Sequence, residues 1–255
     1  IFLISPRRYG KSSLVRQALR AAGRGGALTV EVTVSSYSSY VAFLEGYARA
    51  LVSIETRLDR ARAWLREMLG GVRPEVRVDV GNGDRGALAI SFPAARTGRD
   101  ISLLAQEVFA LPGRIADARR CRLAVALDEF QAIGSFESDG KAPRMHQVEH
   151  ALRAAVQHQR RVGYVFSGSE PTLMERMLGR KRPFYKAGPV MRLEKIDAGL
   201  FAEFVEARFA ATKLRPEPGL GAAIVELAGN LPYDVQRLAH ELWDDGRARV
   251  SPDSS

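Results

Sequence analysis

The sequence predicts an α/β fold in which helices sandwich a parallel sheet, with an inserted β-hairpin and a small C-terminal helical domain. Three observations support this prediction. Short apolar runs alternate with segments of helical periodicity between residues 1 and 169. One stretch inside that region alternates apolar and polar residues instead, and only helical periodicity remains after Asp197.

The strands of the sheet are predicted from apolar runs that have the length of buried strands. These runs are residues 1–4, 27–34, 121–127 and 163–167. Helices are predicted where apolar residues recur every three or four positions, at residues 11–22, 41–69 (one helix or two), 102–119 (interrupted at Pro112-Gly113) and 147–160. Because strands and helices alternate, we expect parallel strands with helices on both faces.

The hairpin is predicted at about residues 72–93. Valines alternate with charged residues before the break at Gly81-Asn82-Gly83, and a second alternating run ends near Phe92. We therefore expect a core at residues 1–195, a helical domain at 196–250 and a polar tail at 251–255. The first residue, Ile1, is not Met and lies inside a predicted strand, so we expect the chain to be a piece of a longer protein.

The composition is that of a soluble globular protein, with 46% hydrophobic and 26% charged residues in 255. No apolar run approaches the roughly 18 residues needed to span a bilayer. The single cysteine, Cys121, excludes an intrachain disulfide and fits a cytoplasmic location. The net charge of +9 favours phosphate-bearing partners, either nucleotides or nucleic acid, and a solvated arginine-rich surface is the alternative explanation.

A phosphate-binding loop is predicted between the first strand and the first helix. Residues 5–12 read Ser-Pro-Arg-Arg-Tyr-Gly-Lys-Ser. The P-loop pattern is Gly, four residues, Gly, Lys and then Ser or Thr at a strand–helix junction. Gly10, Lys11 and Ser12 match this pattern, whereas Ser5 replaces the first glycine. The alternative is a basic turn before a helix. Because a predicted strand and a predicted helix flank the loop, we favour a P-loop NTPase that binds ATP and Mg²⁺.

Each residue of this loop has an expected role. Backbone N–H groups from Arg8 to Ser12 can surround the β-phosphate at the positive end of the helix. Lys11 is expected to reach the β- and γ-phosphates, and the Ser12 hydroxyl to bind Mg²⁺. A side chain at position 10 would collide with phosphate or forbid the backbone angles. The predicted nucleotide-binding residues are Pro6, Arg7, Arg8, Tyr9, Gly10, Lys11, Ser12 and Ser13.

Two acidic residues follow the apolar run at residues 123–127. Asp128 at the tip of a buried strand beside the P-loop strand is expected to hold Mg²⁺, directly or through water. Glu129 is placed to orient and deprotonate the attacking water, so Glu129 and Lys11 are the predicted catalytic residues. Two acids at a strand tip are common, but their occurrence together with the P-loop favours the functional interpretation.

The motifs resemble those of the archaeal-type ATPase family, which is related to the STAND and origin-recognition branches of the AAA+ P-loop ATPases. Residues 5–13 are similar to its P-loop signature Gly-Pro-Arg-Arg-x-Gly-Lys-Thr-Ser, and the carboxylate pair with Phe130-Gln131 resembles its Walker B motif. Three further segments resemble its sensor strand, its Pro-Leu/Phe-Tyr-Arg box and its lid motif, and they are residues 164–169, 183–186 and 229–236.

The resemblance implies further site residues. Ser167 or Ser169 would be the polar sensor of the γ-phosphate or of the attacking water. The lid, with Tyr233, Gln236 and Arg237, would pack over the nucleotide and move with its state. The box that usually carries an arginine carries Lys186, with Arg182 nearby, and both are candidates for neutralising phosphate charge. Because lysine lacks the planar fork of arginine, the sequence argues against an arginine finger here.

The residues and the resemblance together favour a slow, Mg²⁺-dependent ATPase that acts as a regulatory switch, with a protein client or a second copy of itself as partner. The alternative is an ATP-dependent DNA-associated loader or mobile-element ATPase, which the basic charge and the hairpin allow. A P-loop kinase is the least favoured class, since Glu129 suits water better than an acceptor substrate. No membrane partner is expected.

Overall fold

The structure, a computed structural model, describes residues 1–54, 69, 74–79, 87–95, 97–136, 145–212, 214 and 217–250. Contacts group the chain into two compact units. The first consists of Ile1–Ile4 and Ser12–Met191, and the second of Ser5–Lys11 and Arg192–Ser255. The loop predicted to bind phosphate thus clusters with the C-terminal helices. The predicted boundary between residues 195 and 196 stays a prediction.

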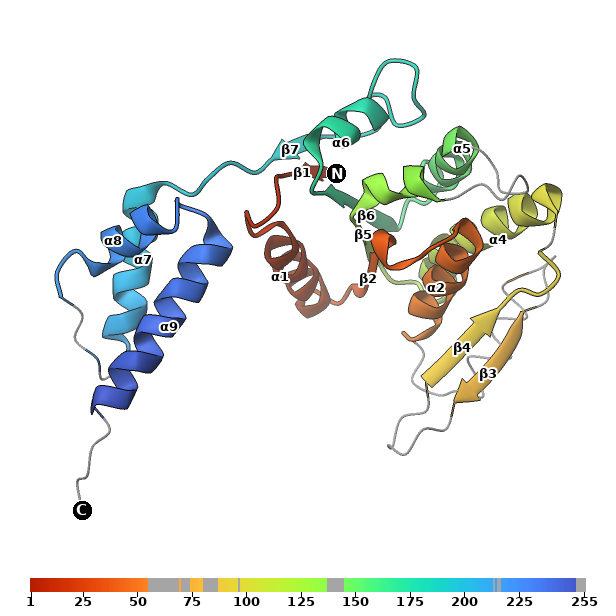
Figure 1. The fold of residues 1–255 in the computed structure, drawn as a ribbon. Coiled ribbons are helices and arrows are strands. Elements are labelled where there is room, and N and C mark those ends of the chain that lie inside the picture. The colour runs from red at the N-terminus through yellow and green to blue at the C-terminus, as the bar shows by residue number, and fades with distance from the viewer. Residues whose placement is uncertain are drawn as a thin grey trace. The chain divides into compact units, whose positions relative to one another are not determined.

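The first unit is built on a five-stranded sheet in the order β2-β5-β6-β1-β7 (Figure 1). The strands are β1 (Phe2–Ile4), β2 (Leu28–Thr33), β5 (Leu123–Asp128), β6 (Val162–Gly168) and β7 (Val190–Arg192). β2 pairs with β5, β5 with β6, and β6 with β1, all in parallel. The predicted parallel sheet is therefore confirmed. The expectation that the strand of Asp128 lies beside the P-loop strand was wrong, because β6 lies between β5 and β1. β7 was not predicted, because a three-residue strand with every residue exposed leaves no apolar pattern.

The register of these strands brings their carboxyl ends to one edge of the sheet. Thr33 of β2 lies opposite Asp128 of β5, and Ile4 of β1 lies opposite Gly168 of β6. Between them, Leu127 of β5 pairs with Phe166 of β6. Side chains that follow β5 and β6 are therefore neighbours, although almost 40 residues separate them in the chain.

The helices of the first unit are α1 (Lys11–Arg24), α2 (Tyr40–Val52), α4 (Gly98–Ala118), α5 (Met145–Val156) and α6 (Pro171–Met177). α1 ends two residues beyond its predicted bound, at Arg24. The predicted interruption at Pro112-Gly113 is absent, because α4 runs through both residues. Pro112 costs the helix one N–H donor, but Leu111, Pro112 and Ile115 are all buried, so tertiary packing holds the helix together. The half of the predicted helix 41–69 between residues 55 and 68 lies outside the described residues.

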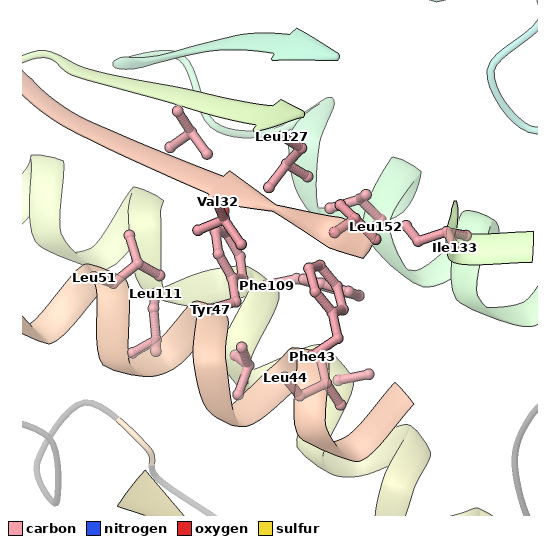
Figure 2. Close-up of a cluster of buried hydrophobic side chains, with 14 of the residues drawn as sticks. Val32, Phe43, Leu44, Tyr47, Leu51, Phe109, Leu111, Leu127, Ile133 and Leu152 are labelled. Atoms are coloured by element: carbon pink, nitrogen blue, oxygen red, sulfur yellow. The ribbon is translucent and has the colours of Figure 1, made fainter. Parts of the chain in front are cut away.

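The core of the first unit lies between α2, α4 and the sheet. Figure 2 shows Val32 and Leu127 of the strands facing aromatic side chains of the helices. Phe43 and Tyr47 of α2 stack with ring centroids 5.9 Å apart, and Phe109 of α4 lies 6.3 Å from Phe43. All five side chains are 3% exposed or less. Burying each large apolar side chain contributes about 1.5–3 kcal/mol, so this contact layer fixes the helices on the sheet.

The predicted hairpin is confirmed. β3 (Glu75–Asp79) and β4 (Ala87–Ser91) pair antiparallel, with Val76 opposite Ile90. Ile90 and Phe92 are buried in the main core, and the Phe92 N–H donates to the Glu45 carboxylate on α2 at 3.0 Å. The hairpin is thus attached to α2 by both packing and a hydrogen bond. The predicted turn at residues 81–83 lies outside the described part of the chain.

The second unit contains the predicted C-terminal helices, which are α7 (Ala198–Ala210), α8 (Leu220–Leu227) and α9 (Pro232–Val250). They enclose a small core of their own. Its buried members are Phe201, Val205, Phe209, Ile224, Val225 and Val235. The predicted tail at residues 251–255 lies outside the described residues. In the part of the chain that the structure describes, no helix has the length and apolar character needed to cross a membrane.

Candidate functional site

The carboxyl edge of the sheet holds a buried aspartate with three hydrogen-bond donors. Asp128 ends β5 and is 5% exposed. Its Oδ2 accepts a hydrogen bond from the Ser12 hydroxyl at 2.8 Å. Its Oδ1 accepts from the Ser167 hydroxyl at 2.6 Å and from the Glu129 N–H at 3.0 Å. Both carboxylate oxygens of Asp128 are therefore held by donors, from α1 on one side and from β6 and the next backbone N–H on the other.

Glu129 stands beside this aspartate in a left-handed backbone conformation, with φ 53° and ψ 43°. Its Oε2 accepts hydrogen bonds from the Ser169 hydroxyl and from the Gln131 side-chain amide, both at 2.6 Å. Ser169 directly follows β6, whereas Gln131 lies two residues after Glu129 in the chain. The glutamate side chain is therefore held from two directions. Left-handed backbone at a non-glycine residue is uncommon and is often found at functional sites.

Gly168, the last residue of β6, provides the space for this cluster. A Cβ at position 168 would lie 2.5 Å from the Gln131 Oε1 and 2.5 Å from the Met174 side chain. Real Cβ atoms do not approach other heavy atoms so closely. Only glycine fits here, because the Gln131 amide that holds Glu129 passes directly over the strand.

The pair Ser12 and Asp128 fits a small divalent cation. Mg²⁺ prefers octahedral oxygen ligands at about 2.0–2.1 Å, which places adjacent ligands about 2.9 Å apart. The Ser12 hydroxyl and the Asp128 carboxylate oxygen are 2.8 Å apart. No group of three or more His, Cys, Asp or Glu residues gathers at a metal-binding distance among the described residues. A cation held here would therefore take its remaining ligands from water or from a bound phosphate.

The loop Ser5–Lys11 belongs to the second unit. Arg8 and Gly10 have positive φ angles of 72° and 84°. Ser5 is 1% exposed, and its hydroxyl donates to the Pro6 carbonyl at 2.9 Å. Lys11 is 5% exposed and is the first residue of α1. Successive residues of unlike backbone hand are typical of anion-binding loops, because their N–H groups turn toward one point.

The start of α9 contacts this loop. The Tyr233 N–H donates to the Arg8 carbonyl at 3.3 Å. The Arg8 guanidinium forms an ion pair with Asp234 at 3.3 Å and lies 5.6 Å from the centre of the Tyr233 ring. The sequence predicted Tyr233 as a lid residue, but it gave no signal for Asp234. An aspartate in the first turn of a helix is ordinarily explained by the helix dipole.

The other two predicted lid residues lie further along α9. Gln236 is exposed and lines an open hollow of about 370 Å³ together with aromatic side chains of α7 and α9. Arg237 is 66% exposed and forms an ion pair with Glu241 at 3.5 Å, one helical turn away. Their role toward a nucleotide stays a prediction.

The two candidates for charge neutralisation lie in different surroundings. Arg182 forms an ion pair with Glu149 of α5, whose side chain is completely buried. Burial raises the pKa of the Glu149 carboxyl above its ordinary value, and Arg182 opposes that rise. Lys186 is exposed, has φ 52°, and places its Nζ 5.4 Å from the centre of the Tyr185 ring. Arg182 would have to leave a buried partner to meet phosphate, so Lys186 is the more accessible candidate.

Comparison with solved structures identifies the fold. No protein-family model and no curated protein matches this chain. A Walker-type ATPase of Pyrococcus abyssi is similar in structure, with a TM-score of 0.59 and 18% identity over 93% of this chain and 62% of that one. The ORC1 protein of Aeropyrum pernix, solved in complex with DNA, gives a TM-score of 0.54 and 14% identity over 93% of this chain and 52% of the other.

A third similar structure is the Aeropyrum pernix ORC2 protein in its ADPNP–ADP complexes. Its TM-score is 0.53, with 15% identity over 93% of this chain and 60% of that chain. The chain therefore has the fold of the AAA+ P-loop ATPases and is similar in structure to members of the origin-recognition branch. It spans between 52% and 62% of the length of these three proteins.

Proposed function

We propose that this protein binds ATP with Mg²⁺ and hydrolyses it slowly, as a regulatory switch. The observation that carries the proposal is the cluster of Ser12, Asp128 and Ser167, with Glu129 beside it at the carboxyl edge of the sheet. In parallel α/β sheets, ligands bind at this edge. The AAA+ fold and the ADPNP–ADP complexes of a similar protein support the choice of nucleotide.

The binding roles follow from the loop. The N–H groups of residues 8–12 surround phosphate, and Lys11 neutralises the charge of the β- and γ-phosphates. Ser12 and Asp128 hold the cation, which when bound withdraws electron density from the phosphate oxygens. Ser167 holds Asp128 in place through its 2.6 Å hydrogen bond, and so acts on the cation site indirectly.

The hydrolytic role belongs to Glu129. Its carboxylate takes a proton from a water whose oxygen attacks the γ-phosphorus, and the bond from that phosphorus to the bridging oxygen breaks. Ser169 and Gln131 hold the carboxylate through one of its oxygens, Oε2. Ser5 in place of the first glycine of the loop and Lys186 in place of arginine are the reasons that we propose slow turnover.

Two variants test the proposal. Lys11→Ala is expected to lose ATP binding in calorimetric titration, while Lys181→Ala, which removes an exposed lysine elsewhere, is expected to keep it. Glu129→Gln is expected to bind ATP as before and to release no phosphate, because an amide cannot accept the proton. The exposed Glu203 provides the matched control, Glu203→Gln. Undiminished ATP affinity in the Lys11 variant would refute the loop assignment.

A second candidate function is an ATP-dependent DNA-associated protein, for instance a loader or a mobile-element ATPase. The net charge of +9 favours it, as does the similar ORC1 structure solved with DNA. A protein that contacts DNA phosphates loses affinity steeply as salt is added. Titration of a fluorescent duplex with the chain at several salt concentrations separates this candidate from a switch whose only partner is a protein.

A further inference from the structure

An open hollow of about 760 Å³ lies at the edge of the sheet opposite to the proposed nucleotide site. It is lined by the first residues of β5 and β6 and by the turns that precede β2, β5 and β6. The Leu28 N–H donates to the Arg122 carbonyl at 2.9 Å, and the Leu123 N–H donates to the Arg161 carbonyl at 3.0 Å. These bonds fix the three turns side by side.

The turns around this hollow are strongly basic. Residues 21–28, 116–124 and 156–164 contain six arginines and a single acidic residue. The arginines are Arg24, Arg119, Arg120, Arg122, Arg160 and Arg161, and all six are exposed. Arg122, Arg160 and Arg161 line the hollow itself.

The one acidic residue of these turns does not neutralise the surface. Asp117 forms an ion pair with Arg161 at 3.5 Å, but the aspartate is 74% exposed and the arginine 52%. An exposed pair of this kind contributes at most about 1 kcal/mol and is screened by salt. A second anion can therefore compete for Arg161, and the other arginines add their charge to the same face.

Fold requirements explain only part of this charge. Arginines near the carboxyl ends of helices are favoured by the helix dipole, which accounts for Arg24 at the end of α1 and Arg119 directly after α4. Arg160 and Arg161 lie beyond the end of α5 at Val156, and Arg122 directly precedes β5. The nucleotide does not explain them either, because the six residues of β5 separate the two edges by about 20 Å.

The side chains around the hollow indicate which kind of polyanion it would bind. None of the exposed large hydrophobic residues among the described part of the chain comes from these three turns. Single strands are held by aromatic side chains that stack on bases, and membrane surfaces by apolar and aromatic anchors. A duplex requires neither, since its phosphates face outward and its bases are already stacked.

We propose that the arginine turns at the amino edge of β2, β5 and β6 bind the phosphate backbone of duplex nucleic acid without regard to sequence. The proposal deepens the DNA-associated candidate function and does not depend on ATP hydrolysis. The arginines act as phosphate contacts, and the duplex lies on the side of the sheet edge away from Asp128.

The test is fluorescence anisotropy of a 20-base-pair DNA duplex, about two turns long, with the full chain in low and moderate salt. The variant Arg122→Ala/Arg160→Ala/Arg161→Ala is expected to weaken binding at least tenfold. Each lost phosphate contact lowers the slope of log K against log salt by about 0.9, so the slope falls by about 2 to 3. The control Arg49→Ala/Arg176→Ala/Arg180→Ala removes three exposed arginines elsewhere in the first unit and is expected to bind almost normally.

Several results would overturn the proposal. If both triple variants lose the same affinity, the charge acts diffusely and the turns are not the site. If the chain does not bind duplex at low salt, the DNA-associated function falls as well, whereas ATP affinity is unaffected. Preference for single strands or for anionic lipid vesicles over duplex would also contradict it. Circular dichroism checks that the variants are folded, and Arg122→Glu alone, expected to weaken binding, replaces the triple variant if that variant does not fold.

Discussion

At the scale of single residues, Gly168 is the position where backbone and site chemistry are most closely linked. Gly168→Ala is expected to destabilise the protein by about 1–3 kcal/mol, because the new Cβ would overlap Gln131 and Met174 at 2.5 Å. Gly163→Ala lies on the same strand, where a Cβ meets nothing within 4 Å, and is expected to change stability by less than about 0.5 kcal/mol. Equal melting temperatures for the two variants would contradict the packing at Gly168.

Ser169 is expected to position the catalytic glutamate of the proposed ATPase. Ser169→Ala removes the 2.6 Å hydrogen bond to Glu129, so the carboxylate loses one of its two restraints. A hydrogen bond to a charged group is worth about 1.5–3 kcal/mol, and we expect kcat to fall at least tenfold with KM for ATP almost unchanged. Phosphate release measures both constants. Ser169→Thr, which keeps a hydroxyl, is expected to restore the rate, and Ser135→Ala, whose hydroxyl donates to the Ala132 carbonyl, is the control.

Glu149 predicts a pH dependence of stability. Burial raises its pKa in the folded protein above the ordinary value of 4.5. A carboxyl whose pKa is raised by folding stabilises the fold below its ordinary pKa, and that contribution is lost as pH rises through the folded pKa. Glu149→Gln replaces the titrating carboxyl with an amide, so the variant does not lose this stability as the pH rises. The unfolding free energy of the variant relative to the original protein is therefore expected to increase from pH 4 to pH 8 in urea denaturation, and parallel pH curves would refute the assignment.

The two carboxylates of the candidate site could be predicted because they follow an apolar run, whereas the two serines were expected from the family resemblance. Asp128, Glu129, Ser167 and Ser169 come directly after or at the end of buried runs, and parallel strands bring such positions together. Gln131 was not predicted as part of the site, although it follows Glu129 by two residues, because only the left-handed turn at Glu129 brings its amide back to the carboxylate.

Contacts between residues far apart in the chain could not be predicted from local sequence patterns. The partner of Arg182 could not be predicted, since Glu149 lies on a helix 33 residues earlier in the chain. The contact of Asp234 with Arg8 spans 226 residues and was missed for the same reason. Both pairs join positions that no local pattern connects, so they are visible only once the chain is folded.

At the scale of elements, the start of α4 has a complete capping box. The Thr97 hydroxyl accepts from the Asp100 N–H at 3.2 Å, and the Asp100 carboxylate accepts from the Thr97 N–H at 2.9 Å. Thr97→Ala is expected to cost about 1 kcal/mol, because the Asp100 N–H loses its acceptor and the Asp100 carboxylate loses the hydroxyl that donates to it. Ser102→Ala in the same helix removes a hydroxyl that donates to the Gly98 carbonyl, and is expected to cost less than about 0.5 kcal/mol in the same denaturation experiment.

The elements that were predicted correctly are those whose burial shows in the sequence. β5 and β6 are apolar runs, and the hairpin strands alternate because one face packs on α2. The predicted break at Pro112 was wrong because a proline costs one hydrogen bond, while the apolar face of α4 contributes far more by packing. Gly113, which looked like part of the break, lets the Gln159 side chain approach, since a Cβ there would lie 2.9 Å from it.

At the scale of the whole molecule, two separate cores predict two separately measurable stabilities. The first unit has a large core around α2, α4 and the sheet, and α7, α8 and α9 enclose their own small core. A small core contributes little net stability. The helical unit is therefore expected to open at lower free energy than the sheet, so its amides should exchange faster with deuterium.

Phe209→Ala tests this separation. Phe209 is 6% exposed in the small core, and its loss there is expected to cost about 3–5 kcal/mol, close to the whole stability of such a unit. Amides of α7 and α9 are then expected to lose protection, whereas those of β5 and β6 keep it. Phe204→Ala, on the same helix but 51% exposed, is the matched control and should leave both patterns unchanged. Loss of protection in β5 and β6 together with the helices would show that the two cores unfold as one.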